Sequence, residues 1–259
     1  MKILALVANE NTYQPRVYDS ILKARHKDFV GIALVPFTTR AKPTKEMAKF
    51  LFDLYGPIGF VRKSLQVVKA KVVDKLSKFT PVNARNSIES VAASYDVPII
   101  YTDNINGDNF LAKVAELKPD VILSSQGHFV GKKLRELPRH GILNKHAGML
   151  PKYRGAYPVF WAMLNGEKEI GITVHFMAKE LDGGEIICQQ LVPIRPEDTF
   201  ESMYQKVIEW TPRLFLQALN ELENGNAEFT PNPDHEATSY PFPTRADVRQ
   251  FRTQGLRIW

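Results

Sequence analysis

Ile3-Leu4-Ala5-Leu6-Val7 is an uninterrupted apolar run, and the recurrence of such runs predicts the fold. A strand that is buried on both faces of a parallel sheet has this kind of continuous apolar sequence. Helical patterns precede two of the later runs, and because strands that alternate with helices form βαβ units, we expect a Rossmann-like α/β fold with a mostly parallel sheet flanked by helices. The later runs lie at residues 31–35, 97–101 and 120–124.

The second half of the chain has shorter and more alternating strand patterns, followed by one long helix. Residues 141–144 predict a short strand, and residues 172–176 and 186–191 alternate between apolar and polar side chains. A helix is expected over about 199–224, with Gly225 as its stop signal. We therefore expect a main domain over residues 1–225, a helical basic insertion at about 42–79 and a C-terminal tail over 226–259.

Cysteine content and the lengths of apolar runs restrict the classes of protein. Cys188 is the single cysteine of the sequence, so no internal disulfide or cysteine-rich metal site can form. The histidines show no His-x-x-x-His pair, and we predict no metal. The first ten residues lack the long apolar core of a signal peptide, and no apolar run approaches the roughly 18 residues of a membrane span. These features predict a cytoplasmic protein without a transmembrane segment.

Positive charge is concentrated in the insertion. The whole chain carries a net charge of +6, whereas residues 40–78 hold ten Lys or Arg residues against three acids, a net charge of +7. Apolar residues occur at helical spacings between these charges, so we expect two helices that meet near Gly56 and Pro57. Four apolar residues should pack on the domain or on a second subunit, because exposing several of them would cost roughly several kcal/mol. They are Phe50, Leu51, Leu54 and Phe60.

Several roles remain open for the basic insertion. A solvated helix face, a clamp for a phosphate-rich substrate, the interface of a homodimer and weak contact with an anionic membrane surface all fit a basic amphipathic helix. A non-enzymatic binding module that uses residues 42–79 is a further alternative.

The residues that can support chemistry lie in the block LNKHAGMLPKYRG at 143–155 and in a later loop. Asn144 and His146 stand two apart at the end of an expected strand, so their side chains should share one face at the carboxyl edge of the sheet. Asp182 precedes Gly183 and Gly184 and is expected in a loop. Asn can donate to a developing oxyanion, and His and Asp can exchange protons. The alternative is that His146 is an ordinary loop histidine and Asp182 a turn former.

This pattern resembles the family of formyltransferases that use 10-formyltetrahydrofolate. The signature of that family is Asn-x-His, then a Leu-Pro-x-Tyr-Arg-Gly-like run, then an Asp in a Leu-Asp-x-Gly loop, and all three parts occur here in order. The resemblance is strong over about residues 86–195, weak over the first 40 residues and poor in the insertion and the tail. One departure is Ala147, where the family often has proline.

The resemblance implies an enzyme with 10-formyltetrahydrofolate as co-substrate, a primary amine as acceptor and a catalytic domain at residues 1–225. Asn144 would polarise the formyl carbonyl, His146 would assist as proton donor, and Asp182 would orient a water and help to remove the proton of the amine. The implied folate-binding residues are Gly127, His128, Val130, Ala178, Lys179, Glu180 and Leu181. The implied acceptor-binding residues are Tyr153, Arg154, Tyr157 and Trp161.

The amine acceptor is expected to be a nucleotide-linked amino sugar, because residues 153–161 most resemble amino-sugar formyltransferases. Their aromatic side chains suit stacking, although Phe160 and Trp161 could equally belong to a helix that packs in the core. Phosphoribosylglycinamide formyltransferases have a Gly-rich loop after the first strand, whereas residues 8–16 lack glycine and include Glu10. Methionyl-tRNA formyltransferases have a further C-terminal domain. The stretch expected after the last long helix, residues 226–259, is too short for such a domain, so nucleic acid is expected to be an unlikely partner. A hydrolase that releases formate from the same folate is another alternative.

Overall fold

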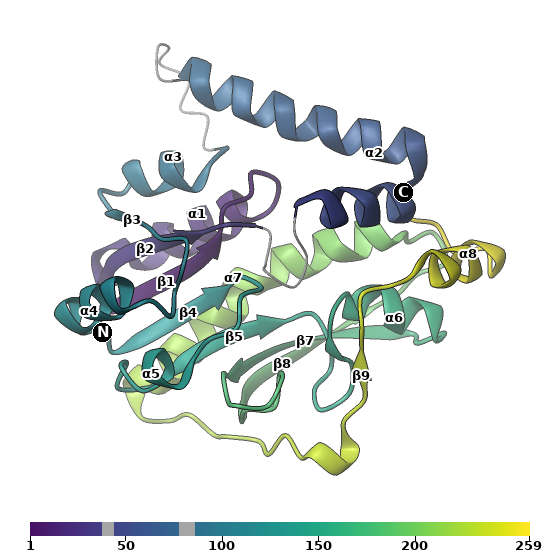
Figure 1. The fold of residues 1–259 in the computed structure, drawn as a ribbon. Helices are drawn as coiled ribbons and strands as arrows, with labels where there is room; N and C mark the ends of the chain where they lie inside the picture. Colours follow the sequence, from purple (N-terminus) through teal and green to yellow (C-terminus); the bar gives the residue numbers. More distant parts are fainter. Residues whose placement is uncertain (38–43, 78–85) are drawn as a thin grey trace. The chain divides into compact units, whose positions relative to one another are not determined.

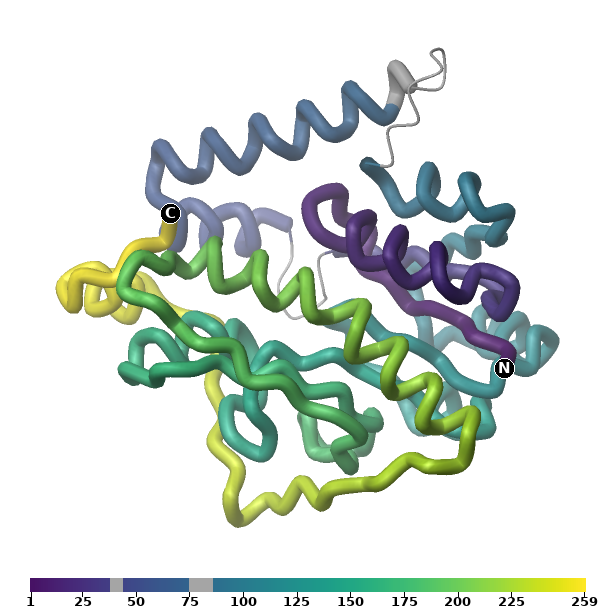
Figure 2. The backbone as a smooth tube through the Cα atoms, turned by 180° about the vertical axis from the view of Figure 1, so that it is seen from behind, coloured from purple at the N-terminus to yellow at the C-terminus, as the bar shows by residue number. Residues whose placement is uncertain are grey.

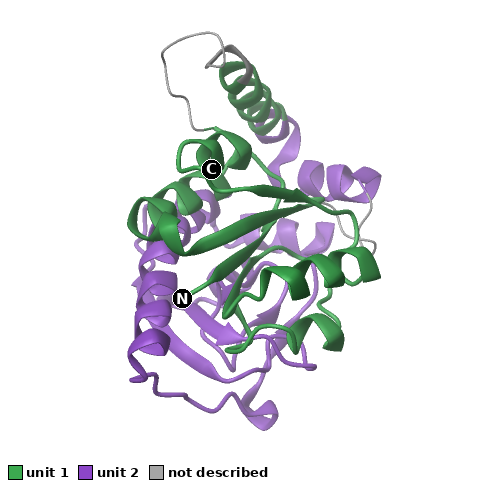
Figure 3. Ribbon diagram, turned by 90° about the vertical axis from the view of Figure 1, so that its left-hand side faces the viewer, with its two compact units in different colours: residues 1–43, 61–143 green, residues 44–60, 144–259 purple. Residues whose placement is uncertain are grey.

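The computed structural model describes residues 1–37, 44–77 and 86–259. Three of the basic residues counted above, Arg40, Lys42 and Lys78, lie outside the described residues, as does the end of the predicted insertion at Phe79. The chain divides into two compact units. Unit 1 comprises residues 1–43 and 61–143, and unit 2 comprises residues 44–60 and 144–259 (Figure 3).

Unit 1 is built on parallel strands, as the apolar runs predict. The order of its strands is β3-β2-β1-β4, and the pairs of β1 with β2, β1 with β4, and β2 with β3 are all parallel (Figure 1). Every residue of β1 is buried, which explains why this strand has no polar position. The elements are β1 (Ile3–Ala8), α1 (Gln14–Arg25), η1 (His26–Asp28), β2 (Phe29–Val35), α3 (Ile88–Ala93), β3 (Ile99–Tyr101), α4 (Asp108–Leu117), β4 (Val121–Ser125) and α5 (Lys132–Arg135).

Unit 2 contains an antiparallel pair, β7 with β8, and a long helix, α7, that packs on both strands (Figure 2). Gly225 ends α7 in the left-handed conformation with φ of 70°, as the stop signal predicts. The elements are β6 (Arg154–Gly155), α6 (Pro158–Leu164), β7 (Glu169–Phe176), β8 (Ile186–Pro193), α7 (Phe200–Asn224), η2 (Asp234–Glu236), β9 (Ser239–Tyr240) and α8 (Arg245–Thr253).

Two elements cross the division between the units. Strand β5 (Ile142–His146) begins in unit 1 and ends in unit 2, and it continues two residues beyond the predicted strand. Helix α2 (Thr44–Ser77) is interrupted at Gly56, whose φ of 70° and ψ of 174° are not helical. The expected pair of helices that meet near Gly56-Pro57 is thereby confirmed. The mostly parallel α/β class with flanking helices is confirmed as well.

The two halves of α2 bury their apolar side chains to different extents. In unit 2, Phe50 and Leu54 are buried, as expected, whereas Leu51 and Phe60 are only half-buried. The ring of Phe50 packs edge-on against Tyr157 and Phe242. In unit 1, the apolar residues of the second half are largely exposed. Among the described residues, no helix is long and apolar enough to span a membrane.

Residues 226–259, expected as a tail, form part of unit 2. Strand β9 pairs with β6 in parallel, and the backbone of Thr230 pairs with that of Ile186. Phe251 of α8 stacks on Phe160 of α6 with ring centroids 4.7 Å apart. This segment therefore lies against the same elements that carry the candidate site.

Candidate functional site

Asn144 and His146, at the end of β5, belong to a cluster of polar side chains in unit 2. His146 is buried, and its Nε2–H donates a hydrogen bond to the carbonyl oxygen of Tyr153, with 2.6 Å between nitrogen and oxygen. The other ring nitrogen, Nδ1, lies 3.6 Å from Oδ2 of Asp182. This distance is too long for a hydrogen bond, so a proton can pass between His146 and Asp182 only after a small movement of one side chain or through a bridging water.

Asp182 is held in its loop by hydrogen bonds to both its side chain and its backbone. The residue has a left-handed backbone with φ of 50°, and its Oδ2 accepts from the backbone N–H of Gly155 at 2.8 Å. Its carbonyl oxygen accepts from Nδ2 of Asn232 at 2.7 Å. Because a non-glycine residue with positive φ is uncommon, these bonds stabilise a conformation that the sequence alone disfavours.

His175, at the end of β7, completes the cluster. Its Nδ1–H donates to the carbonyl oxygen of Phe176 at 2.9 Å, so its Nε2 is left to accept from Nδ2 of Asn144 at 3.3 Å. The same Nε2 lies 3.8 Å from Oδ1 of Asp182. Burial lowers the pKa of His175 from 6.5 to about 4, and the nearby charge of Asp182 opposes this shift only in part. His175 is therefore neutral near pH 7, and its hydrogen bond orients the amide of Asn144.

Arg154 is buried beside the loop of Asp182, and the segment after α7 binds its guanidinium group. Nη1 donates to Asp234 at 2.7 Å, and Nη2 donates to the side-chain and backbone oxygens of Asn232 at 3.0 Å. Asn232 thus contacts Arg154 with its oxygen and the Asp182 loop with its nitrogen. The side chain of Asn232 thus connects Arg154 and Asp182, both of which the sequence analysis assigns to the site.

The other predicted acceptor-binding residues pack inside unit 2. Tyr153 stacks on Tyr240 and donates its hydroxyl proton to Glu167 at 2.7 Å, and its burial and this bond raise its pKa to about 12. Trp161 is buried, stacks on Tyr240 and donates to the carbonyl oxygen of Pro241 at 2.9 Å. The ring of Tyr157 contacts those of Phe50, Phe200 and Phe242. The sequence left open whether Phe160 and Trp161 stack on the acceptor or belong to a helix packed in the core. In the structure both are buried in α6.

The predicted folate-binding residues divide between the units. In unit 1, Nε2 of His128 donates to the carbonyl oxygen of Pro36 at 2.8 Å, Val130 is buried, and Gly127 is exposed. In unit 2, Ala178 is half-buried, and the next three residues of the loop are exposed: Lys179, Glu180 and Leu181. Their assignment to folate remains a prediction.

Sequence reasoning missed His175, which belongs to the cluster, and Asn232, which holds the Asp182 loop beside it. His175 lies seven residues before Asp182 at the polar end of an expected strand, so its position offered a usable signal. Asn232 follows in a proline-containing stretch 50 residues after Asp182, and no local pattern connects the two. Among the described residues, no group of three His, Cys, Asp or Glu side chains could hold a metal ion.

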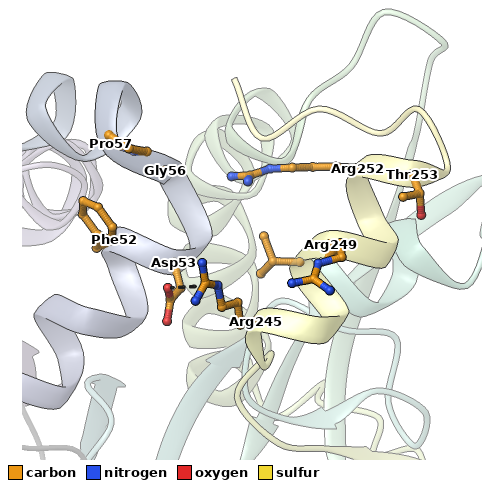
Figure 4. Close-up of a pocket in the computed structure, with 9 residues that line it drawn as sticks. Phe52, Asp53, Gly56, Pro57, Arg245, Arg249, Arg252 and Thr253 are labelled. Atoms are coloured by element: carbon orange, nitrogen blue, oxygen red, sulfur yellow. Dashed lines mark ion pairs between the residues drawn. The ribbon is translucent and has the colours of Figure 1, made fainter.

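A separate pocket of about 420 Å³ lies between the first half of α2 and α8, both in unit 2 (Figure 4). Arg245 lies 4.0 Å from the carboxylate of Asp53, and Arg252 donates to the carbonyl oxygen of Leu54 at 3.0 Å. These contacts hold α8 against α2, and none of the predicted catalytic residues lines the pocket. The reactive cluster is therefore distinct from it.

The fold and the cluster place the protein among Rossmann-like α/β proteins with a polar Asn-His-Asp site. A model of the formyl transferase family matches residues 60–219, more than half of the chain. The chain belongs to the formyl transferase family. The resemblance based on Asn144, His146 and Asp182 is thereby confirmed at the level of the family.

Two methionyl-tRNA formyltransferases are similar in sequence. That of Thermotoga maritima is 35% identical over 166 residues, which cover 64% of this chain and 53% of that protein. That of Halalkalibacterium halodurans is 35% identical over 170 residues, which cover 65% of this chain and 54% of that protein. The chain thus matches about half the length of these relatives.

Solved structures share the fold over nearly the whole chain. An N-formyltransferase from Helicobacter canadensis, in complex with folinic acid and dTDP-3-aminofucose, has a TM-score of 0.61 at 18% identity, covering 97% of this chain and 80% of that one. A phosphoribosylglycinamide formyltransferase from Anaplasma phagocytophilum has a TM-score of 0.61 at 16% identity, covering 93% and 98%. At these identities the likeness concerns the fold.

Proposed function

We propose that this protein transfers a formyl group from 10-formyltetrahydrofolate to a primary amine. The observation that carries the proposal is the cluster in which Asn144 and Asp182 both lie close to Nε2 of His175, with His146 beside Asp182. An amide donor, an imidazole and a carboxylate are the groups that acyl transfer to an amine needs. Membership of the formyl transferase family supports the choice of a formyl group.

Each side chain of the cluster has a separate task in this proposal. Asn144 directs one Nδ2 hydrogen to His175 and can donate the other to the formyl oxygen as negative charge develops there. Asp182 accepts a proton from the attacking amine, directly or through a water. His146 can supply a proton to the nitrogen that leaves the formyl carbon from Nδ1 of its imidazolium form, because its Nε2–H is bound to the carbonyl oxygen of Tyr153. Neutral His175 fixes the orientation of Asn144 and adds no charge.

A nucleotide-linked amino sugar is our first candidate for the acceptor. The resemblance of residues 153–161 to amino-sugar formyltransferases suggested it, and the Helicobacter canadensis enzyme was solved with such a sugar. The buried aromatic side chains of this run take part in packing, so they do not strengthen the assignment. Arg154 would then act by supporting the Asp182 loop as well as by any contact with the acceptor.

Methionyl-tRNA is a second candidate, because the similar curated proteins are methionyl-tRNA formyltransferases at about one-third identity. The family match over residues 60–219 includes Asn144, His146, His175 and Asp182. Identity in the catalytic region supports a shared reaction more directly than a shared acceptor.

The test supplies 10-formyltetrahydrofolate to the purified protein with either a panel of dTDP-linked and UDP-linked amino sugars or methionyl-tRNA, and detects the formylated product by mass. The Asp182→Asn variant serves as the catalytic control. A formylated sugar would establish the first acceptor, and formylmethionyl-tRNA would replace it with the second. Formate release without any amine would instead identify a hydrolase, and no folate turnover by a folded protein would contradict the proposal.

A further inference from the structure

An exposed row of apolar side chains runs along the second half of α2. Val61, Leu65, Val68 and Val72 are 57%, 63%, 55% and 50% exposed, respectively. They follow one another at intervals of four, three and four residues, so at 3.6 residues per turn they occupy one narrow face of the helix. We call these four residues the outer stripe. A contiguous exposed apolar patch of this kind usually marks an interaction surface.

The opposite face of this half of α2 contacts other residues of unit 1. Its residues Lys63, Val67, Ala70 and Asp74 are half-buried and repeat with the same spacing. Near one end, the ammonium group of Lys63 donates to the hydroxyl of Tyr13 and lies 4.4 Å from the centre of its ring. Near the other end, Asp74 accepts from the hydroxyl of Ser87 at 3.0 Å. These contacts fix the rotation of the helix, so the outer stripe faces away from the rest of unit 1. Figure 3 shows this half of α2 within unit 1.

Basic side chains border the outer stripe on both sides. By the helical rotation of about 100° per residue, Arg62 and Lys69 lie along one edge and Lys71 lies along the other. All three are exposed, and residues 61–72 contain no Asp or Glu. Long basic side chains can place their stems against apolar material and their charges in water. The helix therefore presents an apolar centre between two positive edges.

We propose that the outer stripe is a docking surface for an anionic lipid bilayer, with the helix lying in the plane of the membrane interface. An apolar face bordered by Lys and Arg is the pattern of interfacial helices, and anionic headgroups attract the basic edges. The binding is peripheral, in keeping with the finding that no described helix could span a membrane.

The charges beside the outer stripe favour a bilayer over the two other candidate partners, a second copy of the chain and a nucleic acid. Pairing of two copies through the outer stripe would bring Arg62, Lys69 and Lys71 of one copy close to the same residues of the other, with no acid between 61 and 72 to compensate. A nucleic acid would satisfy the positive edges, but its phosphates would face the valine and leucine side chains. A bilayer surface satisfies both the edges and the centre.

The test uses the full chain in flotation assays with vesicles of phosphatidylcholine alone or of phosphatidylcholine with phosphatidylserine. We expect binding to the anionic vesicles only, weakened at high salt. Leu65→Ser/Val68→Ser should weaken it about tenfold or more, and Lys69→Gln/Lys71→Gln should weaken it at least several-fold, since each basic residue contributes roughly fivefold. All seven side chains altered here and in the controls below are exposed, so the variants should keep the wild-type circular dichroism spectrum.

Two matched controls separate the outer stripe from general surface effects. Gln66→Ser changes an exposed polar neighbour on the same helix, and Lys132→Gln/Lys133→Gln removes two exposed charges from α5 of the same unit. Both should bind vesicles as the wild type does. The proposal is overturned if the wild type binds neither vesicle, or if the stripe variants bind like the controls. It is also overturned if Leu65→Ser/Val68→Ser abolishes a dimer in sedimentation, or RNA binding, and leaves vesicle binding unchanged.

Discussion

The side-chain nitrogen of Asn232 donates to the carbonyl oxygen of Asp182 at 2.7 Å, while its side-chain oxygen accepts from Arg154 at 3.0 Å. The same nitrogen also donates to the carbonyl oxygen of Gly184 at 2.9 Å. Asn232 therefore joins two carbonyl groups of the Asp182 loop to the buried guanidinium group. A residue outside the chemical cluster fixes the geometry on which the cluster depends.

Asn232→Ala should lower both stability and turnover. The change leaves two carbonyl groups and one guanidinium nitrogen without this partner, and leaving a buried polar group unsatisfied costs about 1–3 kcal/mol. We expect the free energy of unfolding in urea to fall by about that amount, and kcat to fall about tenfold or more because Asp182 loses its position. Asn226→Ala, at an exposed position two residues after the end of α7, is the matched control and should change neither quantity. A wild-type kcat in Asn232→Ala would show that the loop holds its geometry without this contact.

Asp182→Asn should reduce turnover about a hundredfold, with the fold intact. The amide keeps the shape of the carboxylate and can still accept from the N–H of Gly155, but it cannot take a proton from the amine. Turnover is measured by release of tetrahydrofolate with whichever acceptor the mass-detected assay shows to be formylated. Glu185→Gln removes an exposed charge from the same loop, outside the predicted folate-binding residues, and should leave kcat unchanged. Near-normal turnover in a folded Asp182→Asn protein would remove the carboxylate from the mechanism.

Asn144→Ala should reduce kcat about a hundredfold, corresponding to roughly 3 kcal/mol for one oxyanion donor. Asn144 is half-buried at the end of β5, and its Nδ2 contacts Nε2 of His175, so the loss should fall mainly on kcat and less on KM. Lys145→Ala changes the neighbouring half-buried side chain on the opposite side of the strand and serves as the comparison. Equal losses in the two variants would indicate a disturbed strand in place of a lost oxyanion donor.

The pKa of His175 predicts a loss of stability in acid. The folded state holds this imidazole neutral down to about pH 4, whereas the unfolded state takes up a proton near pH 6.5. Between these values the unfolded state binds more protons, so the free energy of unfolding should fall as the pH falls, by up to about 1.4 kcal/mol per pH unit. His175→Gln should remove this contribution, which urea titrations at about pH 7 and pH 5 can measure. His235→Gln, at an exposed histidine, should retain the acid dependence of the wild type.

The sequence predicted the elements whose side chains follow a local rule. The apolar run at residues 3–7 is a fully buried parallel strand, and Gly56 and Gly225 interrupt or end helices as expected. Strand β5 continues to His146 because its backbone remains extended through polar residues, where the apolar signal stops. Periodicity alone could not show that Leu54 is buried while Leu65 is exposed, because burial depends on the elements that cover each half of α2.

The same distinction between local patterns and long-range contacts applies to the candidate site. Asn144, His146 and Asp182 stand in a recognisable motif, and the structure brings them together in unit 2. Sequence analysis did not predict a role for Asn232, because its contacts with Asp182 and Arg154 join segments that are far apart in the sequence. Such a contact depends on the path of the chain after α7, which no local pattern of residues 226–244 specifies.

Gly184→Ala should disturb the site through packing alone. A methyl group at this position would overlap the carbonyl oxygen of Phe176, which also accepts from His175, and backbone atoms cannot move aside as a flexible side chain can. Overpacking of this kind costs about 1–3 kcal/mol, and here it should also displace the Asp182 loop, so kcat should fall together with the midpoint of thermal unfolding. Gly166→Ala is the matched control, because its φ of 75° strains alanine while the added methyl group meets nothing within 4 Å. The control should cost about 1–2 kcal/mol, the strain of a left-handed alanine, and leave kcat unchanged. If both variants lost stability equally and kept full turnover, the close approach of Gly184 to Phe176 would have no part in positioning Asp182.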